Sequence, residues 1–432
     1  MDLPIDLKLP AMYQVHQKLE VPVVADIPGE IRRELDRIGL PQLVRPGMRI
    51  ALTAGSRGVA NIPLVIATVV RRLKELGARP FVVPTMGSHG GATPEGQVEV
   101  LRGLGVTEER VGAPIVSSLE TVIVGQTPEG ISVNVDKNAA QSDGIIVIGR
   151  VKPHTDFEGP IESGLMKMMV IGLGKHKGAL AAHKAAIAHS FQRTIPSIAR
   201  VVLKEAPILC GLALVENAYD QTAKIVAVLP ADIEKAEVEL LELAKRLLAR
   251  LPYDKLDLLI VDELGKDVSG AGMDTNVIGR IMNIASPEPE SPKITRIFVR
   301  DLSEATHGNA TGLGMADFTT RRCFEKIDYW PTYVNCVTGG SPEKARIPII
   351  CENDRQAIVW ALTTIGPVEP EDARIVWIKN TLEMEVILAS RALLEETKRN
   401  PNLEVVAGPL PLKYEPDWNL VDMYERRPFS HR

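Results

Sequence analysis

Half of the chain's eight histidines fall within one stretch that is also rich in lysine and glycine. They are His154, His176, His183 and His189. Imidazole exchanges protons near neutral pH and also binds transition metals. A solvated basic helix would carry the same residue types, and for any single residue this structural alternative stays open. The density of titratable groups nevertheless predicts an active site centred on residues 149–183, GRVKPHTDFEGPIESGLMKMMVIGLGKHKGALAAH.

Two residues of this stretch have surroundings that favour a chemical role. His154 follows Pro153 at the end of the apolar run DGIIVIGR, which is typical of a buried parallel strand. Strand ends of α/β proteins face the ligand-binding crevice, where a histidine can act as general acid or base. Lys167 lies among leucine and methionine residues, and apolar surroundings lower the pKa of a lysine and make its amine nucleophilic. The alternative for Lys167, a side chain that extends to solvent, is the commoner arrangement.

The elements that must position these residues read as alternating strands and helices. A strand MRIALTAG, an amphipathic helix VIATVVRRLKELG and a strand ARPFVVPTMG form a predicted βαβ unit. The loops after its two strands carry Arg57 and His89. Thr93 is the predicted N-cap of the next helix, which starts at Pro94. TVIVGQT and ISVNVDK form a predicted hairpin, and helices are expected around 195–204 and 233–250.

A second α/β lobe is predicted from about Leu256. LDLLIVDELG, ITRIFVRDLS and ARIVWIKNT read as strands, and NDRQAIVWALTTIG and MEVILASRALLEETKRN read as helices. The predicted fold is therefore α/β, with two lobes, mostly parallel sheets and the active site in the cleft between the lobes. We expect an N-terminal domain over 1–255 that carries the catalytic residues and is joined by the tail 400–432. A C-terminal domain over 256–399 is expected to contribute to substrate selection.

Composition narrows the class of protein. The 432 residues, 45% of them hydrophobic, suffice for two or three domains. The net charge of -5 is dispersed, which argues against nucleic acid or an anionic membrane as partner. No apolar run approaches the ~20 residues that span a bilayer, and the N-terminus has no targeting pattern. Cys210, Cys323, Cys336 and Cys351 show no CxxC spacing, so we expect buried thiols and a cytoplasmic protein.

Motifs for several other chemistries are absent or incomplete. HEXXH, the helical motif of zinc proteases, does not occur, and LTAGSRG lacks the full GxGxxG of dinucleotide-binding loops. A zinc site or other metal site built from His154, His176 and His183 stays open, and it would belong to a metal-dependent lyase or hydrolase. His176 and His183 share a helix face only if the helix continues unbroken across Gly178.

Five residues form one ordered series, namely Arg57 in TAGSRG, His89 in GSHGGAT, His154 after its strand, Lys167 and His183. In order and spacing this series resembles the nickel-dependent lactate racemase family, and the resemblance extends over most of the chain. It implies a nickel pincer nucleotide, which is a pyridinium-3-thioamide-5-thiocarboxylic acid mononucleotide that carries nickel. By position, Lys167 would hold this cofactor covalently and His183 would bind the nickel. His89 and His154 would be the paired acid and base, and Arg57 would hold the substrate carboxylate or the nucleotide phosphate.

The implied activity is a racemase or epimerase that inverts C2 of a 2-hydroxy acid by hydride transfer to the cofactor. No side chain accepts a hydride, which is why a cofactor is needed. The hydroxyl proton of either enantiomer must be removed, and a neutral histidine on each side of the substrate plane can do so. Imidazole and sulfur donors suit Ni(II). The implied partners are a small 2-hydroxy acid and the enzymes that make the cofactor, and a relative that binds ligand without turnover is the alternative.

Departures from the family pattern favour a substrate other than lactate. The link from His154 to Lys167, HTDFEGPIESGLMK, is longer than in the family and contains the acidic residues Asp156, Glu158 and Glu162. In the second lobe, SGAGMDTNVIGRIM has Gly279 and Met282 where the family has glutamine and lysine.

The same segment of the second lobe offers other polar groups. Asp274, Asn276 and Arg280 would hydrogen-bond a larger, more hydroxylated or dicarboxylic substrate. The alternative is that Asp274 and Asn276 only shape a turn before a helix. Three further residues in neighbouring loops, Glu263, Lys266 and His307, receive no predicted role.

Overall fold

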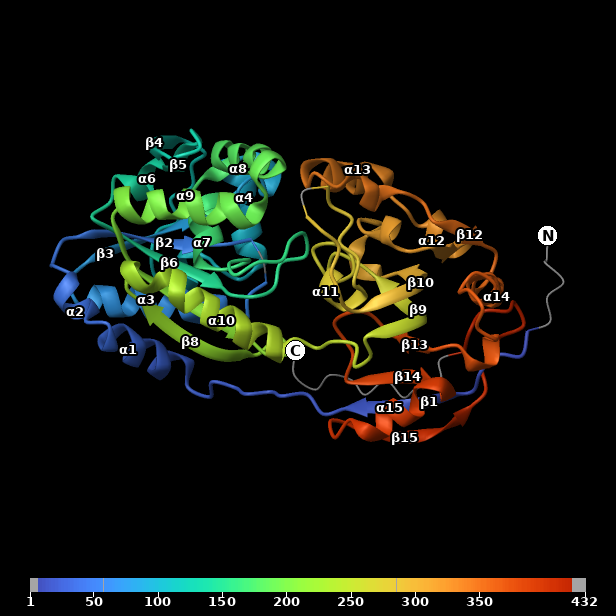
Figure 1. Cartoon of the computed structure of the whole chain (residues 1–432). Coiled ribbons are helices and arrows are strands. Elements are labelled where there is room, and N and C mark those ends of the chain that lie inside the picture. Colours follow the sequence, from blue (N-terminus) through green and yellow to red (C-terminus); the bar gives the residue numbers. More distant parts are fainter. Residues whose placement is uncertain (1–6, 57, 285, 422–432) are drawn as a thin grey trace. The chain divides into compact units, whose positions relative to one another are not determined.

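The computed structural model describes residues 7–56, 58–284 and 286–421, and it divides into two compact units (Figure 1). The N-terminal unit comprises Glu20–Leu248, and the C-terminal unit comprises Met1–Leu19 together with Ala249–Arg432. Both have mostly parallel sheets with helices, which confirms the predicted α/β class. All four cysteines are buried as free thiols, as expected. Within the described ranges no helix has the length and apolar character needed to cross a membrane.

A five-stranded sheet forms the centre of the N-terminal unit, in the order β3-β2-β6-β7-β8. Its strands are β2 (Arg49–Ala54), β3 (Arg79–Pro84), β6 (Gly144–Arg150), β7 (Ile208–Glu216) and β8 (Thr222–Val228). The first four in chain order are parallel, and β8 runs antiparallel to β7. Every residue of β6 except Arg150 is buried. This confirms the prediction of a central parallel strand for DGIIVIGR, because a strand covered on both faces needs apolar side chains on both.

Helices cover both faces of this sheet (Figure 1). α1 (Ile27–Arg37) and α3 (Ile62–Glu75) share one core with alternate residues of β7, including Cys210 and Leu212. Gly211 faces the other way, because side chains alternate along a strand, and there β7 packs against α7 (Leu165–Lys167) and α10 (Ile233–Leu247). The other helical elements are α2 (Leu40–Leu43), η1 (Gly90–Ala92), α4 (Pro94–Gly103), α5 (Glu108–Val111), α6 (Lys137–Ala140), η2 (Met168–Gly172), α8 (Lys175–His189), α9 (Phe191–Glu205) and η3 (Pro230–Asp232).

Local sequence signals in this unit are confirmed. The hydroxyl of Thr93 accepts the N–H of Gly96 at 3.0 Å, and α4 starts at Pro94 as predicted. The predicted hairpin forms from β4 (Thr121–Gln126) and β5 (Ser132–Asp136). The strands β7 and β8, which lie between the helices expected around 195–204 and 233–250, were not predicted.

An eight-stranded sheet forms the C-terminal unit, in the order β12-β11-β10-β9-β13-β14-β1-β15. Its parallel part contains β9 (Lys255–Leu264), β10 (Lys293–Leu302), β11 (Phe318–Thr320), β12 (Ile349–Cys351) and β13 (Ile375–Ile378). β14 (Val386–Ser390), β1 (Met12–Gln17) and β15 (Leu403–Leu410) add an antiparallel part. The helical elements are α11 (Thr275–Ile278), η4 (Glu304–Thr306), η5 (Leu313–Met315), α12 (Arg321–Glu325), α13 (Tyr329–Thr338), η6 (Pro342–Ala345), α14 (Asp354–Leu362), η7 (Pro370–Asp372), η8 (Arg391–Leu393) and α15 (Leu394–Arg399).

The helix predicted for MEVILASRALLEETKRN is wrong in its first half. Val386–Ser390 forms β14, which pairs with β13 and β1, and only Leu394–Arg399 forms the helix α15. Four of the five residues of β14 are buried. A short apolar run has no period that separates a buried strand from a buried helix, so strand pairing decided its structure.

Two strands near the ends of the chain, β1 and β15, lie in a different unit from the one we expected. The N-terminal strand β1 is part of the C-terminal unit, and β15, in the tail predicted to join the N-terminal domain, pairs with β1 there. The physical reason is edge pairing. β1 bonds β14 on one side and β15 on the other, so the backbone groups of both of its edges are satisfied within this sheet.

Candidate active site

The strand order of the N-terminal unit indicates where a ligand would bind. β3 and β6 pair with β2 on opposite sides, so the strand order reverses at β2 and β6. In such sheets the crevice outside the carboxyl ends of the two strands is the usual ligand site. β2 ends just before the loop that contains Ser56, and β6 ends just before Lys152 and His154. The predicted acid/base residue His154 therefore lies at this switch point.

His154 is held by contacts to both of its ring nitrogens. The backbone N–H of Asp156 donates to Nδ1 at 3.0 Å. Nε2 contacts the amine of Lys167. The ring also stacks on Phe157, with ring centroids 4.4 Å apart. The structure thus brings two predicted site residues together and directs Nε2 of the imidazole at the lysine.

Glu162 orders the long link between His154 and Lys167. Its carboxylate accepts the backbone N–H groups of His154 at 2.6 Å and of Gly159 at 3.1 Å, and it pairs with Lys245 at 3.0 Å. The side chain is fully buried, and burial raises the pKa of Glu162 against these opposing contacts. Glu162 therefore holds this loop in its conformation beside the site through hydrogen bonds and an ion pair.

Lys167 is the last residue of α7, and a π-helical segment, η2, follows it directly. The N–H of Leu173 donates to the carbonyl of Met168 at 2.9 Å, which is a bond of the i to i+5 type. π-helical turns are rare in proteins and frequent at functional sites. The backbone is therefore irregular just after the lysine, and α8 starts only at Lys175.

Glycines let the loop after β3 approach this π-helical segment. A Cβ atom on Gly172 would lie 3.0 Å from Thr85 of that loop, closer than side chains tolerate without movement. Gly87 of the loop has a φ of +60°, which favours glycine, and a Cβ there would lie 3.3 Å from Ile171. The loop that carries His89 therefore lies against the segment that follows Lys167.

His89 also contacts the loop after β2. Its Nδ1 lies 2.5 Å from the hydroxyl oxygen of Ser56. Buried Gln97 donates to the backbone carbonyls of Gly87 at 3.1 Å and of His89 at 3.4 Å, which holds the loop in place. Ser56 was not predicted, and the only signal for it in the sequence is its place next to Arg57. Arg57 lies outside the described residues, so its binding role stays a prediction.

His183 lies on α8, and ring contacts through Phe191 and Phe157 connect it with His154. Its ring packs edge-on against Phe191 at 5.4 Å between centroids, and Phe191 stacks on Phe157 at 5.0 Å. Burial lowers the pKa of His183, and the positive charge of Lys167 lowers it further. The imidazole is therefore neutral at neutral pH, which is the form that binds a metal ion.

A buried ion pair that the sequence did not predict lies close to the loop with His89. Lys175 and Asp136 are both fully buried, with Nζ and Oδ2 3.2 Å apart. Nζ also donates to the carbonyl of Pro84 at the end of β3, and Asp136 accepts the N–H of Ala139 at 2.9 Å. Burial lowers the pKa of Lys175 and raises that of Asp136, and their mutual attraction opposes both shifts. The pair ties β3, β5 and α8 together.

Asp274 and Asn276 form a helix cap in the C-terminal unit. Oδ1 of Asp274 accepts the backbone N–H and the side-chain amide of Asn276, both at 2.9 Å. The N–H of Asp274 donates to the hydroxyl of Thr381 at 2.9 Å, and Asp274 is the N-cap of α11. These contacts match the alternative in which both residues shape a turn before a helix. Their role in substrate binding stays a prediction.

The guanidinium of Arg280 binds structural partners at the amino end of β10. It donates to the carbonyls of Met315 at 2.8 Å and of Ile294 and Thr295 at 3.1 Å. It also pairs with Asp317 at 2.8 Å. These contacts anchor the loop that carries Arg280, and the predicted contact of Arg280 with substrate stays a prediction.

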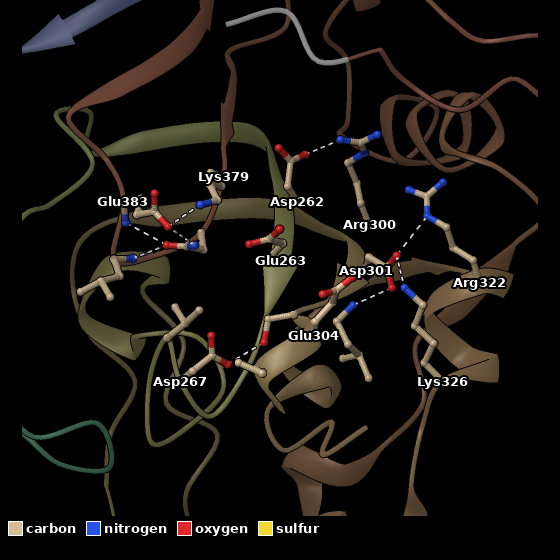
Figure 2. Close-up of a pocket in the computed structure, with 16 residues that line it drawn as sticks. Asp262, Glu263, Asp267, Arg300, Asp301, Glu304, Arg322, Lys326, Lys379 and Glu383 are labelled. Atoms are coloured by element: carbon tan, nitrogen blue, oxygen red, sulfur yellow. Dashed lines mark hydrogen bonds and ion pairs between the residues drawn. The ribbon is translucent and has the colours of Figure 1, made fainter. Parts of the chain in front are cut away.

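A pocket of about 660 Å³ lies at the carboxyl ends of β9, β10 and β13 (Figure 2). β10 and β13 pair with β9 on opposite sides, so this is the switch point of the second sheet. Glu263, which received no predicted role, lines the pocket. Basic groups on the wall pair with acids, namely Arg300 with Asp262 at 2.5 Å, Lys326 with Asp301 at 2.7 Å and Lys379 with Glu383 at 2.5 Å. Such a wall suits a small polar ligand better than an apolar one.

The alternative metal site is not formed. In the part of the chain that the structure describes, no group of three or more His, Cys, Asp and Glu side chains is placed to hold a metal ion. α8 does continue unbroken across Gly178, as that site required, but His176 is exposed while His183 is half-buried. The zinc lyase or hydrolase that would use His154 with these two residues therefore lacks its ligand set.

The chain is similar to lactate racemases in the sequence of its N-terminal part and in its fold. Residues 4–194 match the family model of the lactate racemase N-terminal domain. No curated protein matches the chain. Among solved structures, the chain is similar to the lactate racemase apoprotein from Thermoanaerobacterium thermosaccharolyticum, with a TM-score of 0.51 and 12% sequence identity. That similarity covers 86% of this chain and 99% of the other, and at this identity it concerns the fold alone.

Proposed function

We propose, from the match of residues 4–194 to the family model of the lactate racemase N-terminal domain, that this protein is an isomerase acting on a 2-hydroxy acid. It would invert the C2 centre as a racemase or epimerase. The observation that carries the proposal is the contact of His154 with Lys167 at the switch point of the N-terminal sheet, with His183 close enough for its pKa to respond to Lys167. The departures in the sequence favour a substrate other than lactate.

The described residues fit the nickel pincer nucleotide as cofactor. Lys167 offers an amine for the covalent link, at a position flanked by two histidines. His183 is kept neutral by burial, and a neutral imidazole is a suitable nickel ligand. When bound, the cofactor would supply the hydride acceptor that side chains lack. Enzymes that synthesise it are the proposed partners of this chain.

The two histidines would handle the proton of the substrate hydroxyl. Nε2 of His154 lies against the amine of Lys167, and with that amine used in the covalent link it would exchange a proton with the substrate hydroxyl. His89 is bonded by Ser56 at Nδ1, and its Nε2 would perform the same task on the opposite enantiomer. Arg57 would orient the substrate through its carboxylate, since a guanidinium forms paired hydrogen bonds with that group.

The proposed reaction is tested by following the α-hydrogen. Protein produced together with the cofactor-synthesising enzymes is incubated with a panel of 2-hydroxy acids in deuterium oxide. We expect inversion of C2 with retention of the original hydrogen, measured by chiral chromatography and mass spectrometry. Incorporation of deuterium at C2 would indicate proton abstraction and contradict hydride transfer. Binding without inversion of any substrate would support the non-catalytic relative.

Replacement of either proposed acid/base residue is expected to affect turnover and not loading. His154→Gln and His89→Gln should each lower kcat by about 10²- to 10⁴-fold, which is the usual contribution of general acid–base catalysis. Nickel content and the adduct on Lys167 should stay at the level of the unmodified sequence. His189→Gln, at an exposed position of α8, is the matched control and should retain full activity. Unchanged kcat in both site variants would exclude the proposed roles.

A further inference from the structure

Glu237 of α10 is a carboxyl group buried in the N-terminal unit. The residue is 1% exposed. Its Oε2 accepts the backbone N–H of Met166 at 2.9 Å, and the N–H of Leu165 also bonds the carboxyl group. Within the described residues Oε1 has no hydrogen-bond partner. Burial of a carboxyl group that lacks some of its hydrogen bonds costs free energy, so an apolar side chain at this position would be less costly to bury.

Protonation reduces this cost. Burial raises the pKa of Glu237 to about 7, against the opposing effect of the two backbone donors. At neutral pH a large share of the molecules therefore carries the neutral acid, which avoids a bare charge in apolar surroundings. The carboxylate and the neutral acid of Glu237 both keep an oxygen that can accept the backbone N–H groups.

The backbone groups that Glu237 accepts belong to α7, the short helix that ends at Lys167. N–H groups in the first turn of a helix have no partner within the helix, so an outside acceptor stabilises them. The contact is close, since a Cβ atom on Gly164 would lie 2.5 Å from the carboxyl carbon of Glu237. On the side of β7, a Cβ on Gly211 would lie 2.4 Å from Leu165. The start of α7 is thus clamped between α10 and the sheet.

The same helix also supports the loop that carries His154. Lys245 of α10 pairs with Glu162, and Glu162 accepts the backbone N–H of His154 at 2.6 Å. α10 therefore holds both members of the contact between His154 and Lys167, one through an ion pair and the other through the carboxyl group of Glu237.

We propose that Glu237 is the positioning residue for Lys167, and that its carboxyl group holds the backbone before Lys167 so that the amine stays at His154. α7 has three residues and continues into a π-helical segment, so it lacks the regular backbone bonding that would fix the lysine by itself. The inference rests on the proposed function only in the purpose of the arrangement, which is attachment of the cofactor to Lys167.

The test measures the chemical accessibility of Lys167 in the full-length apoprotein. Acetic anhydride acylates lysines, and mass spectrometry of peptides gives the acylation rate of Lys167 relative to the exposed Lys184 of α8. Glu237→Ala should raise this ratio about tenfold, on the scale expected for loss of a helix cap. Glu237→Gln keeps an acceptor oxygen and should leave the ratio near its original value. After loading, the yield of adduct on Lys167 should fall in Glu237→Ala and not in Glu237→Gln.

Two control variants separate positioning from general loss of stability. Glu239→Ala changes an exposed neighbour on α10, and Leu241→Ala changes a residue of the same helix that is 1% exposed. Neither should raise the acylation ratio, although Leu241→Ala should lower the thermal unfolding midpoint. If Glu237→Ala does not fold, Glu237→Leu, which fills the space without an acceptor, is measured with the same expectation.

The proposal is overturned if the acylation ratio of Lys167 to Lys184 is unchanged in the variant that lacks an acceptor at position 237. It is also overturned if Leu241→Ala raises this ratio as much as that variant does. Acylation is measured without cofactor, so it is independent of the proposed chemistry. Absence of any adduct on Lys167 in the unmodified protein would count against the proposed function, while a tenfold change in acylation would still establish the positioning role of Glu237.

Discussion

Replacement of Lys167 by methionine is expected to reduce racemisation to the uncatalysed background and to leave the protein without a covalent adduct. Methionine retains the apolar body of the side chain but has no amine to join to a cofactor. No other side chain supplies the missing hydride acceptor, so the loss should be complete and not graded. Intact-protein mass spectrometry after production with the cofactor-synthesising enzymes measures the adduct, and chiral chromatography measures the inversion.

Lys184→Met is the matched control for this variant. Lys184 is an exposed lysine on α8, the residue directly after His183, and its replacement should keep both the adduct and the activity. Lys167→Met itself should remain folded, because Lys167 is only partly buried. An adduct of the same mass in Lys167→Met, or turnover near that of the control, would show that another group holds the cofactor.

Lys175→Met should lower the free energy of unfolding of the N-terminal unit by about 3–5 kcal/mol, the usual cost of leaving one member of a buried ion pair without its partner. Both side chains of the pair are fully buried, so the carboxylate of Asp136 would lose its counter-ion at a place shielded from solvent. All four tryptophans, Trp330, Trp360, Trp377 and Trp418, lie in the C-terminal unit. Their fluorescence therefore follows that unit, and hydrogen exchange of N-terminal peptides should be used to detect the loss.

The stability defect of Lys175→Met should depend on pH in a defined direction. Burial already raises the pKa of Asp136, and removal of Lys175 takes away the attraction that opposes this shift. A carboxyl group with a raised folded-state pKa contributes stability at low pH and loses it as pH rises. The defect should therefore be smallest near pH 4 and grow toward pH 7.

Two further variants define the origin of this defect. Adding Asp136→Asn to Lys175→Met removes the orphaned charge and should restore part of the lost stability. Lys177→Met, at an exposed position of the same helix, should change stability by no more than about 0.5 kcal/mol. A defect in Lys175→Met that is equal at all pH values, or as small as that of Lys177→Met, would contradict the buried ion pair.

Local patterns were sufficient for the elements that carry the site. The βαβ unit, the N-cap at Thr93 and the central strand before His154 each depend on residues that are close in sequence. Helix caps and apolar runs act through neighbouring backbone groups, so a single sequence reveals them. The same reasoning failed for Val386–Ser390, where pairing with β1, far away in the chain, made a strand out of an apolar run.

The sequence by itself determined which residue types could do chemistry and which loops carry them, because titratable side chains at strand ends are visible without a fold. His89 and His154 were predicted in this way, and Lys167 and His183 were predicted from the stretch rich in histidine and lysine and from the family resemblance. Only the tertiary structure decided that His154 touches Lys167, that Glu237 accepts backbone N–H groups of the helix that ends at that lysine, and that Lys175 pairs with Asp136. These partners come from separate elements, and strand order together with burial brings them into contact, which no periodicity along the chain records.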